Sequence, residues 1–360
     1  IDAVADAMRT VGNASSLHGL GRAARRRVEE SRETIAATLG AKPSEVIVTS
    51  GGTEADNIAI AGIVASRQTA DPRRRRLLLP AIEHHAVLDA AEALHARGQA
   101  EITWLEVDDF GRVHADTLAA AIAEDPESVA LVSVMWANNE VGTVNDAPAL
   151  AAVAASRGVA LHLDAVAAFG HVPVGFREWR DGAVGTTGLV AMSLSAHKVG
   201  GPVGVGALVV ARAADPVPLI HGGGQQRGLR AGTQDVPGAV AFAVAAELAV
   251  AELDAEAGRI AVLRDQLIGG VIGSVPGAIL LGDPDRRLPG NVHMLFPGAV
   301  GETLLFLLDQ QGIAVSTGSA CQAGVPEPSH VVLAIGRAAD EARQVLRLTL
   351  GRTSTDADVA

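Results

Sequence analysis

Short apolar, β-branched runs alternate with alanine-rich stretches of helical periodicity through the first two-thirds of the chain. Residues 45–49 have the pattern of a strand, and residues 54–66, which follow a glycine pair, have that of a helix. Six further runs predict strands, at 77–79, 102–105, 129–135, 159–163, 191–194 and 205–210, and helical stretches at 85–97 and 149–157 separate several of them. This alternation predicts an α/β fold with a mainly parallel sheet wrapped by helices, and with ligands at the carboxyl ends of its strands.

The pattern changes from about residue 237 onward. The elements predicted there are a long helix to about 253, an apolar-periodic segment to 268, a strand at 291–296, a helix at 302–311, and short strands at 313–316 and 345–350. We therefore predict two domains, a large one over residues 1–254 and a smaller α+β C-terminal one over residues 255–360.

Composition and charge exclude several classes of protein. The formal net charge of −12 argues against a broad surface for nucleic acid or for an anionic membrane. Although 48% of the residues are hydrophobic, no apolar run is long enough to span a bilayer. The only cysteine, Cys321, cannot form an intramolecular disulfide and suits a reducing compartment. We expect a cytoplasmic protein that binds neither membranes nor nucleic acid directly.

Lysine is almost absent from the chain, since Lys42 and Lys198 are the only two among 29 basic residues. A lysine kept in such a chain is a candidate for amine chemistry that arginine cannot perform, such as forming an imine. Lys198 lies just after a predicted strand, beside Ser195 and His197, and before a glycine pair. This context favours a Schiff-base lysine over an exposed loop lysine. Lys42 precedes a proline and suits the surface.

Three polar segments follow predicted strands. Gly51-Gly52-Thr53 joins a strand to a helix, where free N–H groups could bind a phosphate, although such glycine pairs are also common without a ligand. Asp164 ends a strand and could either pair with a cofactor's pyridinium nitrogen or cap a loop. An imidazole of His84-His85 could stack on a planar ring or move protons. Adjacent histidines lie too close to share one metal ion, so we expect no metal.

Cys321 lies in a segment of small residues, Ser316-Thr317-Gly318-Ser319-Ala320-Cys321-Gln322-Ala323-Gly324. A lone cysteine is more often a buried small hydrophobic residue. The glycine and serine neighbours instead favour a reactive thiol.

Taken in order, these segments resemble the cysteine desulfurases of the NifS/IscS type, in the class V aminotransferase group of fold-type I pyridoxal-phosphate (PLP) enzymes. The similarity extends from residues 12–18 to 346–351, and its five motifs are Thr49-Ser50-Gly51-Gly52-Thr53-Glu54-Ala55-Asp56-Asn57, Glu83-His84, Asn138-Asn139-Glu140-Val141-Gly142, Ser195-Ala196-His197-Lys198 and Gly318-Ser319-Ala320-Cys321. The resemblance implies a large domain with a seven-stranded, mainly parallel sheet, and pyridoxal 5′-phosphate as cofactor.

The resemblance also implies roles for the residues at the cofactor. Lys198 would form the Schiff base, Asp164 would pair with the pyridine nitrogen, and His84 would stack on the ring. The residues that would hold the phosphate are Gly52, Thr53, Ser195 and His197, together with Thr233 reaching in from the partner subunit of a homodimer.

For the substrate, the resemblance implies that Asn139 and Arg347 bind the carboxylate of L-cysteine, Arg347 as a two-pronged fork. Cys321 would receive the sulfur as a persulfide and leave alanine as the product. An iron–sulfur scaffold or a sulfur-carrier protein would then accept the sulfur, for iron–sulfur clusters or for thiolated tRNA.

Three departures from the family pattern affect the details of this prediction. The family's opening stretch, ending in Ala-Thr-Thr-Pro, is absent, so we expect further residues before Ile1. Ala167 replaces a glutamine that would hydrogen-bond the cofactor's ring oxygen, and Gln226 replaces a usual glutamate. These changes bear on cofactor tuning and substrate scope more than on the type of reaction.

Two alternative functions remain open. A related PLP lyase acting on selenocysteine or a substituted cysteine would not need Cys321. A catalytically weak sulfur-transfer scaffold would not need Lys198, Asp164 and His84.

Overall fold

The structure is a computed structural model, and it describes residues 1–10, 12–180, 183–318 and 327–360. Its central element is a seven-stranded sheet in the order β1-β7-β6-β5-β4-β2-β3. The strands are β1 (Val46–Thr49), β2 (Arg76–Pro80), β3 (Glu101–Leu105), β4 (Val129–Met135), β5 (Ala160–Asp164), β6 (Gly188–Ser195) and β7 (Gly206–Val210). From β3 to β6 all neighbours are parallel, and only β7 pairs antiparallel, with β6 and β1. The prediction of a mainly parallel seven-stranded sheet is confirmed.

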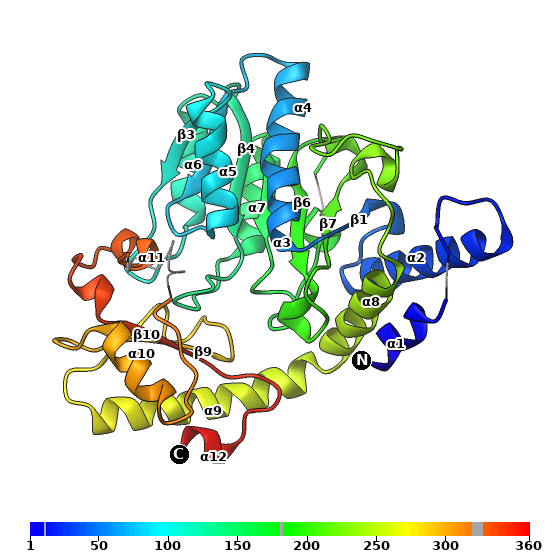
Figure 1. Cartoon of the computed structure of the whole chain (residues 1–360). Coiled ribbons are helices and arrows are strands. Elements are labelled where there is room, and N and C mark those ends of the chain that lie inside the picture. The colour runs from blue at the N-terminus through cyan, green and yellow to red at the C-terminus, as the bar shows by residue number, and fades with distance from the viewer. Residues whose placement is uncertain (11, 181–182, 319–326) are drawn as a thin grey trace.

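Helices cover this sheet, as Figure 1 shows. They are α3 (Gly52–Asn57), which continues through a π-helical turn into α4 (Ile63–Ala70), α5 (His85–Ala96), α6 (Ala115–Ala123) and α7 (Ala147–Ser156). α4 packs on β4, and α7 packs on β5 and β6. Strands β4 to β6 are buried along their whole length, as expected for parallel strands covered by helices, and the antiparallel β7 is buried as well.

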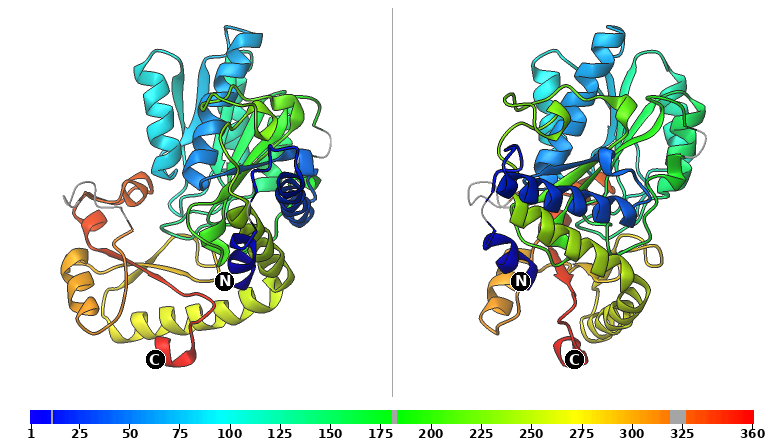
Figure 2. Two further views of the ribbon diagram at one scale, coloured as in Figure 1. Left: turned by 45° about the vertical axis from the view of Figure 1, so that its right-hand side comes forward. Right: turned by 90° about the vertical axis from the view of Figure 1, so that its right-hand side faces the viewer.

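A second helical layer lies beside the sheet. α2 (Gly19–Thr38) packs along α8 (Val236–Ala251), and α1 (Asp2–Met8) also contacts α8. α9 (Leu253–Ser274) follows directly and extends from there to the smaller C-terminal part of the molecule (Figure 2). No single described helix is long and apolar enough to cross a membrane. Taken together, α8 and α9 would reach that length and apolar composition, but the two helices are bent by 72° where they meet.

The smaller part contains a three-stranded antiparallel sheet in the order β10-β9-β8. Its elements are β8 (Ile279–Leu281), β9 (Asn291–Leu295), α10 (Gly301–Asp309), α11 (His330–Ala334), β10 (Val345–Thr349) and α12 (Asp356–Val359). The strand predicted at 313–316 is wrong, because only Ser316 forms a bridge, with Arg347. The helices α2 and α6 and the strand β8 are not among the elements predicted from the pattern.

Candidate functional site

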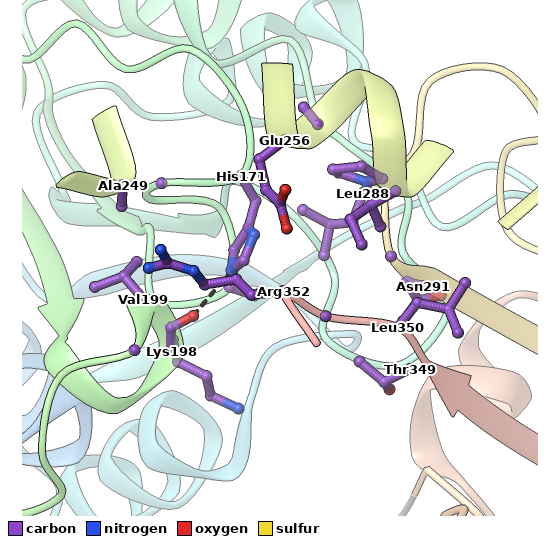
Figure 3. Close-up of a pocket in the computed structure, with 18 of the residues that line it drawn as sticks. His171, Lys198, Val199, Ala249, Glu256, Leu288, Asn291, Thr349, Leu350 and Arg352 are labelled. Carbon is purple, nitrogen blue, oxygen red and sulfur yellow. Dashed lines mark hydrogen bonds between the residues drawn. The ribbon is translucent and has the colours of Figure 1, made fainter. Parts of the chain in front are cut away.

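A cavity of about 550 Å³ lies at the carboxyl ends of the central strands, between the sheet and the smaller C-terminal part. Figure 3 shows Lys198 at this cavity, with residues of α9 and of the β10 region across from it. The predicted site residues that line the cavity are Asn139, His197, Lys198 and Arg347, together with Ala167, the residue that departs from the family pattern. The fold therefore brings together segments that are far apart in the sequence.

Lys198 is positioned by a short 3₁₀ turn, Ala196–Val199, that follows β6. Gly200, at φ 82°, ends this turn, so the chain turns away immediately after the lysine. The Lys198 carbonyl accepts a hydrogen bond from His171 Nε2 at 2.9 Å, which holds the backbone in place (Figure 3). Desolvation by the surrounding protein lowers the pKa of the Lys198 amine, and the positive charge of Arg347 lowers it further. A larger share of neutral amine, the form that attacks carbonyls, follows from this shift.

Asp164 is the last residue of β5 and is buried. Its Oδ1 accepts a hydrogen bond from the Val166 backbone N–H at 2.8 Å. Burial raises the pKa of Asp164 to about 6, although the Val166 N–H and the Lys198 charge both lower it. A cation placed against this carboxylate would favour its charged form.

His84 caps the start of α5, where its Nδ1 accepts a hydrogen bond from Ala86 N at 3.1 Å. Partial desolvation lowers the pKa of His84, as do the charges of His85 and Lys198. This shift favours the neutral imidazole, the form that suits stacking on a planar ligand.

A second corner of the site suits a phosphate. Gly52 begins α3, and a Cβ on Gly52 would lie 2.6 Å from Val166 Cγ2, so only glycine fits there. The same Cβ position is 3.6 Å from Ser195 Cβ, and Ser195 Oγ lies 2.8 Å from His197 Nδ1. Thr53 occupies the first turn of α3 and is exposed. The start of α3, the Ser195 hydroxyl and the His197 imidazole are therefore groups at this corner that could hydrogen-bond an anion.

Arg347 reaches the site from the second sheet. It lies on β10, and its Nη1 donates to the Asn139 backbone carbonyl at 2.9 Å. Its Nε is buried and has no hydrogen-bond partner among the described residues. The contact uses the Asn139 backbone, so the proposed substrate-binding role of the Asn139 side chain remains a prediction. The guanidinium thus keeps donors available for a carboxylate.

Two predicted residues cannot be placed beside Lys198 here. Cys321 lies outside the described residues, which end at Gly318 and resume at residue 327. Thr233 is exposed, and its predicted contact is with a partner subunit. The preceding Arg230 is ion-paired with Glu54 of α3 at 2.8 Å, which fixes this segment near the start of that helix.

The departure at Gln226 has a structural explanation. Gln226 is buried, its Nε2 donates to the Val48 carbonyl at 3.1 Å, and its Oε1 accepts from Arg32 Nη2. A glutamate could not donate the hydrogen bond to Val48. The amide therefore satisfies both neighbours.

Three buried polar side chains below the site are missing from the sequence predictions as functional residues: Asp56, Glu83 and His162. The signal that could have identified one of them is the position of His162, two residues before Asp164 in an otherwise apolar strand. Residues two apart on a strand lie on the same face of the sheet.

Comparison with known proteins places the chain in a family. The aminotransferase class-V family model matches residues 1–360. The chain is 51% identical to an IscS-like cysteine desulfurase of Mycobacterium tuberculosis, over 100% of this chain and 89% of that protein. A solved NifS-like protein superposes with a TM-score of 0.88 at 34% identity, over 100% of this chain and 93% of that one. Another solved structure, SspA in complex with cysteine, superposes with a TM-score of 0.80 at 31% identity, over 97% of this chain and 95% of that one. This chain therefore belongs to the class-V aminotransferase family.

Proposed function

We propose that this protein is a PLP-dependent cysteine desulfurase that converts L-cysteine to L-alanine and a persulfide on Cys321. The observation that carries the proposal is the meeting of the Lys198 amine and the Arg347 guanidinium at one cavity, with the buried Asp164 carboxylate close enough to Lys198 for their charges to interact. Relatives named cysteine desulfurase and a neighbour solved in complex with cysteine support the same reaction.

The residues fit pyridoxal 5′-phosphate at its ring nitrogen, at its ring face and at its phosphate. Asp164 would meet the ring nitrogen, and its position at the end of β5 leaves it no positive partner in the described chain other than Lys198. His84 would stack on the ring, and the phosphate would be held by Gly52, Thr53, Ser195 and His197. When bound, this cofactor supplies an electron sink for the charge that develops at Cα.

The protein's own groups would divide the remaining tasks. Arg347 would hold the substrate carboxylate, with Asn139 beside it. The Lys198 amine, whose pKa is lowered, would take the Cα proton. The Cys321 thiolate would attack the substrate sulfur, so that an S–S bond forms as the C–S bond breaks, and a proton would complete alanine.

The wider setting of the enzyme belongs to the same proposal. Thr233 reaching a partner's phosphate site would make the protein a homodimer. The persulfide would pass to an iron–sulfur scaffold or a sulfur-carrier protein. The single cysteine supports a reducing compartment such as the cytoplasm. The proposed division into domains between residues 254 and 255 falls within the first turn of α9.

The decisive experiment measures alanine and sulfide from L-cysteine, with and without a thiol reductant. We expect alanine in both cases and sulfide only when the reductant releases it from the enzyme. Sulfide release that ignores the reductant would favour the lyase that acts on substituted cysteines. Purified protein with no visible absorption from a bound cofactor would favour the scaffold.

A further inference from the structure

The Glu140 carboxylate contacts the chain on both sides of Cys321. Glu140 is 3% exposed, and its Oε2 accepts a hydrogen bond from the Ser329 hydroxyl at 2.5 Å. Gly318 lies against the same oxygen, since a Cβ added to it would come 2.8 Å from Oε2, and its φ of 91° also favours glycine. One side chain therefore holds the last residue described before Cys321 and the residue that caps α11 after it.

The chain on the N-terminal side is also joined to Arg347. Ser316 N donates to the Arg347 carbonyl at 3.0 Å, and Arg347 N donates to the Ser316 carbonyl at 2.6 Å. Ser316 Oγ accepts a hydrogen bond from Gly318 N at 3.1 Å. The Arg347 side chain in turn reaches the carbonyl of Asn139, the residue before Glu140. These contacts form a closed circuit, in which the proposed substrate arginine and both sides of the cysteine segment share one support.

The turn that carries Glu140 is held by hydrogen bonds from both parts of the molecule. Asn138 Oδ1 accepts hydrogen bonds from Glu140 N at 2.8 Å and from Val141 N at 2.9 Å, and its Nδ2 donates to the Ile82 carbonyl at 3.0 Å. From β9, Asn291 Nδ2 donates to the Glu140 carbonyl at 2.9 Å. Both asparagine side chains are buried. The backbone beneath the carboxylate is therefore fixed on two sides.

Packing alone does not explain an acid at this position. A carboxyl group taken out of water is destabilising unless hydrogen bonds or an opposite charge compensate for the lost hydration. The Ser329 hydroxyl supplies the hydrogen bond. Desolvation lowers the pKa of Arg347, and the charge of Glu140 offsets part of that shift. Both groups that compensate for the buried acid belong to the circuit, so Glu140 joins them and does not merely fill space.

We propose that Glu140 is a positioning residue for sulfur transfer, which fixes the chain on both sides of Cys321 relative to the Arg347 guanidinium. The inference rests on the proposed function, in which the Cys321 thiolate forms an S–S bond with the substrate sulfur. The electron pair of the breaking C–S bond stays with carbon, which takes up a proton to complete alanine. Arg347 would hold the substrate carboxylate, so the approach of thiolate to sulfur depends on how the two supports are joined. A misplacement of about 1 Å can cost on the order of a hundredfold in rate.

Single-turnover experiments on the purified protein with its cofactor separate this role from substrate binding. The protein is mixed with saturating L-cysteine, and alanine is measured together with the persulfide, which is trapped by alkylation. Glu140→Ala should slow persulfide formation by at least about tenfold, the effect of losing one charge-assisted hydrogen bond, while the Kd for cysteine changes by less than about threefold. Glu140→Gln keeps an oxygen acceptor for Ser329 and should recover part of the rate. The control Glu106→Ala, at an exposed glutamate, should match the native protein.

Two results of this experiment would overturn the proposal. One is an unchanged rate of persulfide formation in Glu140→Ala. The other is a loss of cysteine affinity as large as the loss of rate, which would indicate a general disturbance of the site. If the native protein forms no alanine, the proposed function fails and this inference fails with it. Alanine from the native protein and an unperturbed rate in Glu140→Ala refute this inference alone.

A double-mutant cycle tests the route through Ser329. Ser329→Ala removes the other partner of the same hydrogen bond and should also slow persulfide formation. If the two side chains act through that bond, the doubly changed protein should be slower than Glu140→Ala by no more than about twofold, whereas losses that multiply would contradict the proposal. Gly318→Ala provides an independent perturbation even where these variants fail to fold, because its methyl group would press on Glu140 Oε2. We expect slowed persulfide formation with cysteine affinity retained, and a native rate would overturn the proposal.

Discussion

Replacing Arg347 by lysine keeps the charge and removes the fork. In the structure Nη1 donates to the Asn139 carbonyl at 2.9 Å, while Nε is buried without a hydrogen-bond partner in the part of the chain that the structure describes. A bound cysteine carboxylate would use the free donors of the guanidinium. An ammonium is a compact point charge that cannot keep the Asn139 contact and also hold a carboxylate at two points. Losing one charge-assisted hydrogen bond costs about 1.5–3 kcal/mol, so the affinity for cysteine should fall about ten- to 150-fold.

The assay is the rate of alanine formation as a function of cysteine concentration, with direct titration of cysteine binding beside it. The matched control is Arg352→Lys, because Arg352 lines the same cavity but is exposed and ion-paired with Glu252 at 3.0 Å. An exposed pair contributes little, so this control should change cysteine saturation by less than about threefold. Unchanged saturation in Arg347→Lys, or an equal loss in both variants, would remove Arg347 from the substrate site.

Three further predictions concern the amine and the thiol. Lys198→Ala should abolish turnover, and borohydride reduction of the native protein followed by peptide mapping should find the cofactor on Lys198; a label on Lys42 would refute the assignment. Cys321→Ser should stop sulfur release while the cofactor stays bound, because a hydroxyl is a far poorer nucleophile toward sulfur; undiminished release would support a lyase. Arg347→Met should raise the pKa of the Lys198 amine, because a nearby positive charge that lowers it is removed, and Arg347→Lys should not. The measurement is the rate at which cofactor-free protein binds the cofactor covalently, recorded as a function of pH for the native protein and both variants. Equal pH profiles for the native protein and Arg347→Met would contradict the prediction.

Some elements could not be predicted because their stability comes from distant partners. α2 carries several arginines, and the small apolar stripe of Ala24, Val28 and Ile35 gains its burial from packing along α8. The segment 313–316 has strand-forming residues, but only Ser316 finds a bridge partner. The pattern of residues within one segment does not show whether the fold places a partner strand beside it.

The sequence by itself determined the central sheet, because buried parallel strands leave continuous apolar runs that adjacent residues alone reveal. It also indicated two candidate cofactor residues: Lys198, because lysine is scarce in the chain, and Asp164, because its carboxylate ends a predicted strand. Only the tertiary structure brought Arg347 to the cavity of Lys198, and His162 to the hydroxyls of Ser133 and Ser193. These contacts depend on strand order and on the packing of separate elements, and neither is encoded in the spacing of residues along the chain.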